Sequence, residues 1–493
     1  MAPRSVATVG VVLAGMSLLL CAPTLDAQEG KPLFSEAFSA EEFASRRAAL
    51  AAAIGPGSMA LIQGASGAHS STRFRQSNQF FYLTGVEAPN AYLLIQGGGG
   101  HSTLYLPPRN ESRERTDGAV LSADDPEGVA RLTGMDAVAL VDRLSEDLGR
   151  RTPSGTRVYT LFQPAEGPSE SRAGVLRAEA DRFTDPWDGR VGREGHFIHL
   201  IRTRFPFIEV HDLSPMLDVL RLIKSDAELA QIERATRLGG EALMEAMRST
   251  RPGIRERELD AVARFIFVRH GAQGEAYRAI VASGRNAWFA HHRAGNKEMR
   301  ADELVLMDFC PDLGYYRCDV TRMWPVDGSF SAVQRELYGF YLAFYNSILA
   351  EMRPGISAQQ VKLNALPAID AALAATRFSK DTYERAARDF VEDFRVGAQN
   401  PNTGLGHGVG LSTHDPGRSE GGILRPGMVF VIEPQFRVPE EEIYIRLEDM
   451  IVIREHGAEV ISDWVPRDIA GIEALMREEG LLQRHPGLQG WQR

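Results

Sequence analysis

The sequence predicts an α/β protein with two folded domains, over residues 34–186 and 220–475. Three observations support this expectation. The chain has 493 residues, which is too long for one ordinary hydrophobic core. Its first part alternates short strand-like and helix-like segments. Its second part contains two pairs of helix-like segments joined by a Pro-Gly-Ile turn, each followed by apolar strands that carry acidic residues.

The composition is that of an ordinary globular protein, with 44% hydrophobic and 24% charged residues. The formal net charge is -10, and no run of Lys or Arg stands out. Because phosphate binding needs a basic surface, we expect no nucleic acid partner. Small or peptidic ligands fit this composition better.

Residues 1–27 have the pattern of a cleaved signal peptide. Arg4 supplies the positive start, residues 6–20 are almost wholly apolar, and cleavage is expected before Gln28. The apolar run is shorter than the ~20 residues that a spanning helix needs, so we expect a periplasmic or secreted protein without a membrane anchor. Cys21 follows a leucine where a lipoprotein would have a small residue, so lipidation is the less favoured alternative.

Within the first domain, periodicity and turn residues predict several short elements. They are a helix at 41–54, a strand at 59–63 and a hairpin of strands 91–96 and 102–106. The aromatic residues at 80–82 are interpreted as core. No group of candidate ligands is visible in this domain. Residues 152–188 are rich in Pro, Gly, Ser and charge and are expected to be irregular or an insertion.

Residues 187–219 are expected to connect the domains, and residues 476–493 to form a C-terminal tail. In the second domain, Ser225 is the expected N-cap of a long helix. The Pro-Gly-Ile turns at Pro252 and Pro354 each separate two helices. We therefore expect two related halves that face each other.

The segment LVLMDFCPDLGYYRCDVTRM contains Asp308 and Asp319, eleven positions apart. A tight turn over residues 311–314 would pair Asp308 with Arg317 and place both aspartates on one side of the hairpin. Two buried carboxylates side by side need a cationic partner. A divalent metal is one possibility, and salt bridges to Arg317 or Arg322 are the alternative.

The same pairing points Cys310 and Cys318 to opposite faces, so no disulfide is expected. A three-residue turn would bring the two cysteines to one face and would separate the aspartates.

Further candidate ligands lie in the last third of the chain. Glu433 ends one apolar strand and Glu448 sits inside another, where only a paired charge should be tolerated. His407 lies in a Gly-rich run between the two halves. Taken singly, His407 could be an ordinary hydrogen-bonding residue, and Glu448 could form an ion pair with Arg446.

Taken together, these residues predict a metal site made of two aspartates, one histidine and two glutamates. Its four negative charges would balance two divalent cations. Two metals about 3.5 to 4 Å apart can share a bridging hydroxide that attacks a carbonyl. Manganese is the first choice, with zinc and cobalt as alternatives, and magnesium is less suitable because it is seldom held in an all-protein cage.

The five residues, with SGRNAWFAHH before them and RPGMVFVIEP and IRLED around the glutamates, resemble the aminopeptidase P and prolidase branch of the M24 metallopeptidases. The segment FRQSNQFFYLTG resembles the creatinase-like N-terminal domain of that branch. The resemblance implies an α/β (α+β) chain with a C-terminal pita-bread catalytic domain. It covers residues 34–474.

The resemblance also implies individual roles. His291 would contact the substrate near the scissile amide, and His414 would hydrogen-bond the tetrahedral intermediate. Glu433 would be both ligand and proton shuttle, and Arg446 would order the site from behind the ligands. Thr403 departs from the branch, which usually has a histidine four residues before the metal-binding histidine, at a position that helps to bind substrate beyond the scissile bond.

The expected activity is removal of an N-terminal residue from peptides whose second residue is proline, by a homo-oligomeric enzyme. A prolidase acting on Xaa-Pro dipeptides is the alternative within the branch. The alternative from another class is a non-catalytic peptide-binding protein on the same fold, which predicts the loss of at least one ligand. All five are present. Proline-containing peptides are the expected partners.

Overall fold

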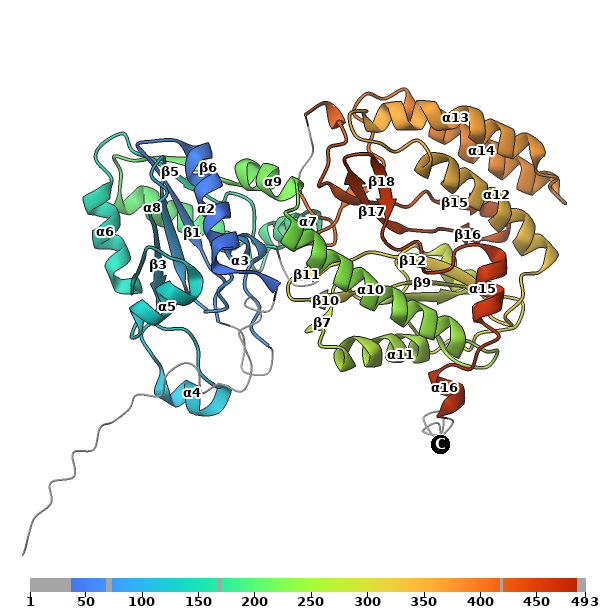
Figure 1. Cartoon of the computed structure of the whole chain (residues 1–493), viewed down its shortest axis with the longest axis horizontal. Helices are drawn as coiled ribbons and strands as arrows, with labels where there is room; N and C mark the ends of the chain where they lie inside the picture. The colour runs from blue at the N-terminus through green and yellow to red at the C-terminus, as the bar shows by residue number, and fades with distance from the viewer. Residues whose placement is uncertain (1–36, 68–72, 167–170, 417–419, 486–493) are drawn as a thin grey trace, which may run out of the picture.

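The computed structural model describes residues 37–485, except for 68–72, 167–170 and 417–419, and contains two α/β domains (Figure 1). The expected signal peptide and the last residues of the expected tail lie outside this range. Among the described residues, no helix combines the length and apolar character needed to cross a membrane.

The N-terminal domain is built on a six-stranded sheet in the order β4-β3-β2-β1-β5-β6. The strands are β1 (Ser58–Gln63), β2 (Tyr92–Gln96), β3 (Ser102–Leu106), β4 (Ala137–Leu140), β5 (Arg157–Thr160) and β6 (Glu209–Asp212). The first three pair antiparallel, which confirms the expected hairpin. The other strands join in parallel at the two sides.

Both faces of this sheet are covered by helices. Ala60 and Ile62 on β1 belong to the core that includes α2 (Ala40–Ile54), whereas Met59 and Leu61 belong to a smaller core that includes Ile201 of α8. This alternation follows from the two-residue period of a strand. The helices after α2 are α3 (Asn78–Thr84), α4 (Glu111–Asp117), α5 (Pro126–Thr133), α6 (Leu144–Arg151), α7 (Arg172–Thr184), α8 (Arg193–Arg204) and α9 (Ser214–Leu222).

Two expectations for this region differ from the structure. Residues 152–188 are not irregular, because they include β5 and α7. Residues 187–219 are more than a connection, because they include α8 and β6, and β6 is the edge strand of the N-terminal sheet. Turn-forming residues between such short elements dominate the local composition and hide the elements from pattern analysis.

The second domain begins at α10 (Asp226–Ser249), which has the expected start. Ser225 Oγ accepts a hydrogen bond from the Glu228 amide at 3.2 Å, and the Glu228 carboxylate accepts one from the Ser225 amide at 3.1 Å. The helices that follow are α11 (Glu256–Arg269), α12 (Ala332–Leu349), α13 (Ala358–Ala375), α14 (Asp381–Ala398), α15 (Ile469–Leu475) and α16 (Leu481–Arg484). Both Pro-Gly-Ile turns separate helices, as expected.

The strands of this domain lie between its two groups of helices, with α10 and α11 on one side and α12 to α14 on the other (Figure 1). One half contains the sheet β12-β9-β8 and the other contains β13-β14-β17-β18. The strands are β7 (Gly274–Glu275), β8 (Ile280–Ser283), β9 (Leu304–Asp308), β10 (Pro311–Leu313), β11 (Tyr316–Arg317), β12 (Thr321–Pro325), β13 (His407–Gly408), β14 (Val429–Ile432), β15 (Phe436–Val438), β16 (Ile443–Ile445), β17 (Asp449–Arg454) and β18 (Gly457–Val460). A bridge between Thr321 and Glu448 joins the halves.

The hairpin around the two aspartates has a different register from the expected one. Its tip is Gly314-Tyr315, both at positive φ, so Asp312 pairs with Arg317, and Asp308 pairs with Thr321 instead of Arg317. A tyrosine seldom occupies this backbone region, which is why sequence favoured the preceding turn. Tyr315 is held there by the N-terminal domain: its ring stacks on Phe81 at 3.6 Å between centroids.

The expectation that the cysteines point to opposite faces is also wrong. Cys310 and Cys318 are both buried free thiols, and both sulfurs lie against Gly239 of α10. A Cβ at Gly239 would come within 2.7 Å of Cys318 Sγ and 3.2 Å of Cys310 Sγ. The ladder is interrupted at both cysteines, because β9 ends at Asp308 and β11 at Arg317, so the side-to-side alternation of a continuous strand does not hold there.

Candidate metal centre

The structure brings the five expected ligands together between the two halves of the second domain. Asp308 ends β9, Asp319 precedes β12, His407 begins β13, Glu433 follows β14 and Glu448 precedes β17. Their ligand atoms fall into overlapping groups in which all atoms lie within 4.8 Å of one another. One group joins Asp308, Asp319 and Glu448, and another joins His407, Glu433 and Glu448. Each half of the domain therefore contributes ligands to one cluster.

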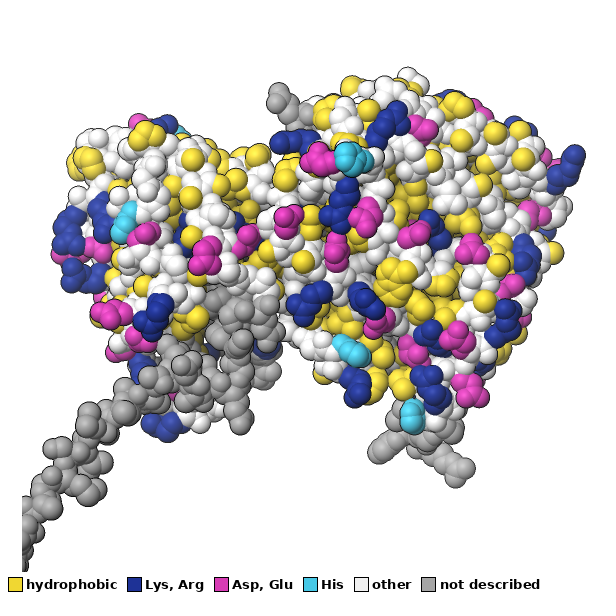
Figure 2. Space-filling view, viewed as in Figure 1, with side chains coloured by type: hydrophobic (Ala, Val, Ile, Leu, Met, Phe, Trp, Pro, Cys, Tyr) yellow, Lys and Arg dark blue, Asp and Glu magenta, His cyan; other side chains and the backbone are white. Residues whose placement is uncertain are grey.

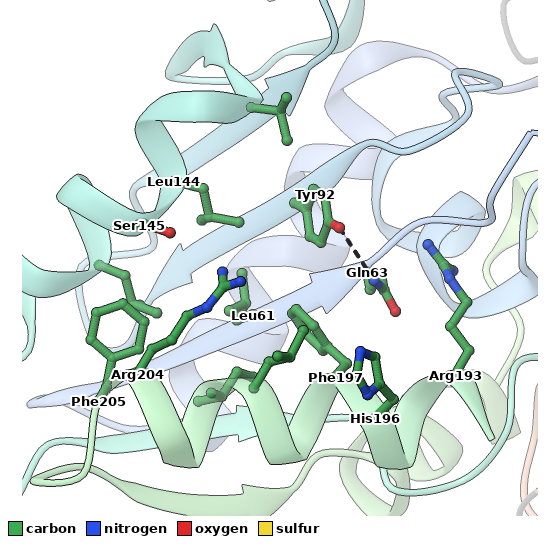
Figure 3. Close-up of a pocket in the computed structure, with 14 residues that line it drawn as sticks. Leu61, Gln63, Tyr92, Leu144, Ser145, Arg193, His196, Phe197, Arg204 and Phe205 are labelled. Atoms are coloured by element: carbon green, nitrogen blue, oxygen red, sulfur yellow. Dashed lines mark hydrogen bonds between the residues drawn. The ribbon is translucent and has the colours of Figure 1, made fainter. Parts of the chain in front are cut away.

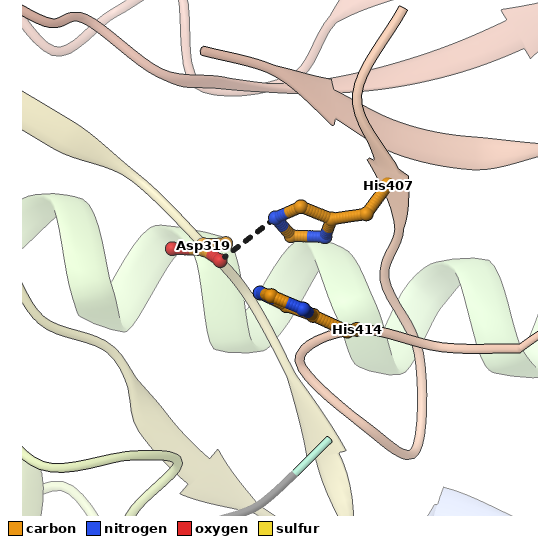
Figure 4. A group of neighbouring side chains, drawn as sticks. All are labelled: Asp319, His407 and His414. Carbon is orange, nitrogen blue, oxygen red and sulfur yellow. Dashed lines mark ion pairs between the residues drawn. The ribbon is translucent and has the colours of Figure 1, made fainter. Parts of the chain in front are cut away.

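His407 is at the centre of the cluster. Its Nε2 atom lies 3.6 Å from Asp319 Oδ2, 3.6 Å from Glu448 Oε1 and 3.8 Å from Glu433 Oε1. Figure 4 shows its ring beside that of His414, with one ring nitrogen directed toward Asp319. These separations exceed a hydrogen bond and are suited to atoms that surround a shared cation.

Three of the carboxyl groups hold protons unusually tightly. Burial raises the pKa of Asp308 despite the attraction of Arg446. Burial and the charges of Glu448 and Asp308 raise the pKa of Asp319 well above its ordinary value. Burial and the charge of Glu448 raise the pKa of Glu433 to about 7. The positive charge near these carboxyl groups is therefore too small to stabilise their ionised forms, and bound divalent cations would supply the missing charge.

Glu448 and His407 behave as a pair. The interaction with His407 and the charge of Arg446 overcome burial and lower the pKa of Glu448. Glu448 correspondingly raises the pKa of His407, against the effect of burial. Glu448 Oε1 is buried and has no hydrogen-bond partner among the described residues. A buried carboxylate oxygen that faces an imidazole nitrogen without bonding to it fits a metal site, because one ion could bind both atoms.

The side chains behind the ligands include two that the sequence did not point to. The Tyr277 hydroxyl contacts both aspartates, with Asp319 Oδ1 at 2.6 Å and Asp308 Oδ1 closer still. Thr321 Oγ1 donates to Glu448 Oε2 at 2.8 Å. No sequence signal marked Tyr277, which precedes the cluster and lies outside its strands. Thr321 could have been found from its position two residues after Asp319, on the same strand face.

Arg446 occupies the expected position behind the ligands. Its Nη1 donates to Glu433 Oε2 at 2.9 Å, and its Nη2 contacts Asp308 Oδ2. The alternative salt bridges for the aspartates are wrong: Arg322 pairs with Asp449 at 2.5 Å, and Arg317 lies 3.8 Å from Asp312. Arg446 is thus one cation facing several carboxylates, which favours the metal interpretation over ion pairing alone.

Two further histidines, His291 and His414, are exposed. The ring of His414 lies in a group with Asp319 and His407 whose ligand atoms are within 4.8 Å of one another. The ring centroids of His414 and His407 are 3.9 Å apart. Loss of hydration and the charge of His407 lower the pKa of His414 to about 4, so its imidazole is neutral at neutral pH. His291 is exposed and acts electrostatically on His414. The adjacent His292 instead lies 3.5 Å from the buried Glu256 carboxylate.

Thr403 has a cationic neighbour that the sequence analysis missed. Lys362 Nζ, on α13, donates to Thr403 Oγ1 at 2.7 Å. Partial burial lowers the pKa of Lys362. The amino group of Lys362 therefore lies beside the position where the resembling branch usually has a histidine.

Other surface features lie away from this cluster. A cavity of 340 Å³ lies between the N-terminal sheet and α6 and α8, with Leu61, Leu148 and Ile201 among its apolar lining residues (Figure 3). None of the five expected ligands lines it. On the face shown in Figure 2, acidic and basic side chains are interspersed.

Comparisons with known proteins agree with this geometry. Residues 230–455 match the model of metallopeptidase family M24, and residues 43–159 match the aminopeptidase P N-terminal domain. The Xaa-Pro aminopeptidase of Escherichia coli K12 is 31% identical over 89% of this chain and 98% of its own length. The E. coli aminopeptidase P structure with the inhibitor Pro-Leu has a TM-score of 0.70 and 29% identity, covering 89% of this chain and 98% of that chain. A zinc-substituted form of E. coli aminopeptidase P in complex with product also has a TM-score of 0.70 and 29% identity, covering 89% of this chain and 98% of that chain.

The fold and the site define a metallopeptidase of the aminopeptidase class. The chain belongs to metallopeptidase family M24, in its Xaa-Pro aminopeptidase branch. It has that branch's pita-bread domain, preceded by an aminopeptidase P N-terminal domain, and uses divalent metal.

Proposed function

We propose that this chain removes the N-terminal residue from peptides with proline in second position. The observation that carries this proposal is the five-ligand cluster in a chain that matches Xaa-Pro aminopeptidases over both domains. The complete ligand set favours an enzyme over a non-catalytic peptide-binding protein.

Two divalent ions would be held by Asp308, Asp319, His407, Glu433 and Glu448, with manganese as the first choice. When bound, they would supply an activated bridging hydroxide and neutralise the charge that develops on the substrate carbonyl. The chain's own residues would orient the ligands. Tyr277 and Arg446 contact Asp308 from different sides, and Arg446 also holds Glu433.

Three residues would act on the substrate and its protons. Glu433 has a pKa of about 7 without metal and one oxygen facing the cluster, so it is placed to move a proton toward the leaving proline nitrogen. His414, neutral at neutral pH, would donate a hydrogen bond to the carbonyl oxygen of the scissile bond as charge develops there. His291 would contact the substrate near the same amide.

The second candidate is a dipeptidase of the prolidase type, and the position of Lys362 beside Thr403 supports it. A dipeptide ends in a carboxylate directly after proline, and the ammonium group beside Thr403 could replace the positive charge of the missing histidine. If that charge does not reach the substrate, tripeptides and longer peptides should be preferred.

The test is metal analysis by plasma emission, followed by cleavage of Xaa-Pro dipeptides and their tripeptide extensions. Comparison of the wild type with Thr403→His and Lys362→Met separates the two activities through kcat/KM. Higher kcat/KM for tripeptides supports the aminopeptidase, and higher kcat/KM for dipeptides supports the dipeptidase. Failure to cleave either class with metal restored would contradict both.

We further propose that the protein is exported to the periplasm or secreted, with cleavage near Gln28, and that the mature protein is a homo-oligomer. The short apolar leader supports export. N-terminal sequencing of material outside the cytoplasm should find Gln28 or a neighbouring residue first, and an intact Met1 there would contradict cleavage. Size-exclusion chromatography with light scattering would measure the assembly.

A further inference from the structure

The loop that carries His414 is fixed at several points by backbone hydrogen bonds. The Asp415 amide donates to Gly408 O at 2.8 Å, and the Gly410 amide donates to Ser412 O at 3.1 Å. The loop is closely packed at Gly410, where the Cβ of any other residue would lie 2.7 Å from Asp415 Oδ2. His414 itself is exposed, so its position depends on this loop.

Asp415, directly after His414, is tied to two buried cations. Its Oδ1 accepts from Arg221 Nη2 at 2.5 Å, and its Oδ2 accepts from Lys224 Nζ at 3.0 Å. Oδ1 also accepts the Ser412 amide at 3.2 Å. Arg221 belongs to α9, which precedes the catalytic domain. The loop is thus attached to the segment that joins the domains.

Glu166 extends this attachment into the N-terminal domain. Its Oε2 accepts from Arg221 Nη2 at 2.8 Å and from Ser412 Oγ at 2.6 Å. Asn78 Nδ2 lies 3.0 Å from the same oxygen and 3.1 Å from Leu411 O. Glu166 is 2% exposed. Two side chains of the N-terminal domain therefore bond directly to the His414 loop.

The contacts around Glu166 and Asp415 form a network of ion pairs. Three carboxylates face three cations, and these six residues are Glu166, Asp218 and Asp415 with Arg172, Arg221 and Lys224. The charges of Arg221 and Arg172 overcome burial and lower the pKa of Glu166 to about 2. Buried ion clusters often add little net stability relative to apolar packing, whereas their geometry is specific. A positioning function accounts for such a cluster better than stability does.

We propose that Glu166 of the N-terminal domain is a positioning residue for His414, acting through Ser412, Arg221 and Asp415. The N-terminal domain would then complete the catalytic site without touching the substrate through this residue. The proposal rests on the role of His414 in the proposed function.

A double-mutant cycle tests the coupling. Glu166→Gln keeps the shape but removes the charge that binds Arg221. We expect kcat on an Xaa-Pro tripeptide to fall at least about tenfold, with metal content unchanged, but less than about twofold in a His414→Ala background. Equal losses in both backgrounds, or no loss in the wild-type background, would overturn the proposal. If Glu166→Gln does not fold, Ser412→Ala replaces it in the same double-mutant cycle, because this change removes the hydrogen bond from Ser412 Oγ to Glu166.

Glu245→Gln is the matched control. Glu245 is 9% exposed, accepts from Arg484 Nη2 at 2.9 Å and contacts the Leu481 amide, so it ties α16 to α10. Its loss should change stability but leave kcat within about twofold, because none of these partners belongs to the His414 loop. A comparable fall in kcat in this variant would show that loss of any buried ion pair lowers kcat, and it would overturn the proposal.

Hydrogen exchange supplies a readout that does not depend on activity. The amides of Gly410, Ser412 and Asp415 should exchange at least about tenfold faster in Glu166→Gln than in the wild type. Their exchange rates should be unchanged in Glu245→Gln. Unchanged exchange in Glu166→Gln would overturn the proposal. If the metal-loaded wild type cleaves no Xaa-Pro peptide, the proposed function fails, and the exchange rates still decide whether Glu166 holds the loop.

Discussion

At the scale of single residues, Tyr277 orders the two aspartates. Its hydroxyl lies between Asp308 and Asp319, and burial with the charges of both aspartates raises its own pKa well above the ordinary value. The phenol therefore stays protonated and is a permanent donor. A donor in this position fixes the orientation of the ligands without neutralising them.

Tyr277→Phe should therefore weaken metal binding by about 10- to 100-fold while the protein remains folded. The check is a metal titration followed by calorimetry or activity recovery. Tyr444→Phe is the matched control, because the buried Tyr444 hydroxyl has no hydrogen-bond partner among the described residues. Equal metal affinity in Tyr277→Phe and the wild type would show that this hydroxyl does not order the site.

Replacement of His414 distinguishes a loss of turnover from a loss of metal binding. If this histidine stabilises the developing oxyanion, His414→Ala should lose about 3 kcal/mol of transition-state stabilisation, which is about a hundredfold in kcat, and keep its metal. Parallel metal analysis and single-turnover kinetics measure both quantities. Because the His414 ring also lies near Asp319 and His407, loss of metal in this variant would make His414 a ligand instead.

At the scale of elements, the hairpin between β9 and β12 connects the site to the domain junction. The aspartates lie near its base, and Tyr315 at its tip is held by the N-terminal domain. Its hydroxyl accepts from the Gln76 amide at 2.7 Å and donates to Glu87 at 2.8 Å. The packing of α10 on this hairpin is equally close at Gly239.

Gly239→Ala should therefore destabilise the protein by about 1–3 kcal/mol, because the added methyl group collides with the two thiols. Gly339→Ala, in the interior of α12, is the control: no atom lies within 4 Å of a Cβ at that position. It should stabilise by about 0.5–1 kcal/mol through helix propensity. Chemical denaturation measures both, and a neutral Gly239→Ala would contradict the close packing described here.

The sequence predicted which five residues come together but not the register of the hairpin that carries the two aspartates. Carboxylates inside apolar strands, such as Asp308 and Glu448, are visible in any register because burial alone makes them costly. The turn at Gly314-Tyr315 was not visible, because the contacts that stabilise Tyr315 at positive φ come from the other domain. The same limit applies to Tyr277 and Lys362, whose partners are distant in sequence.

At the scale of the whole molecule, the metal-free acidic cluster should make stability depend on pH. The folded-state pKa of Glu433 is raised from 4.5 to about 7, and those of Asp308 and Asp319 are also raised. At these three carboxyl groups the folded state thus holds more protons than the unfolded chain, and together they outweigh His414, whose pKa falls from 6.5 to about 4 and acts in the opposite direction. Stability is therefore lost as pH rises, and the raised pKa of His407 acts in the same direction.

Chelated protein should accordingly show a falling Tm between pH 4.5 and about 7. The slope should be smaller in Glu433→Gln, which cannot ionise, and smaller in metal-saturated wild type. Calorimetry at several pH values is the measurement. The same slope in chelated wild type and Glu433→Gln would contradict the raised pKa of Glu433.

We propose that the two halves of the catalytic domain jointly hold two divalent ions that serve cleavage at Xaa-Pro bonds. The most direct measurement is metal stoichiometry together with kcat/KM for an Xaa-Pro tripeptide in the wild type and Asp308→Ala. Asp327→Ala, an exposed aspartate after the same hairpin, is the control. We predict two ions per chain in the wild type and the control, and loss of at least one ion with nearly all turnover in Asp308→Ala. Two bound ions and normal turnover in Asp308→Ala would contradict the account.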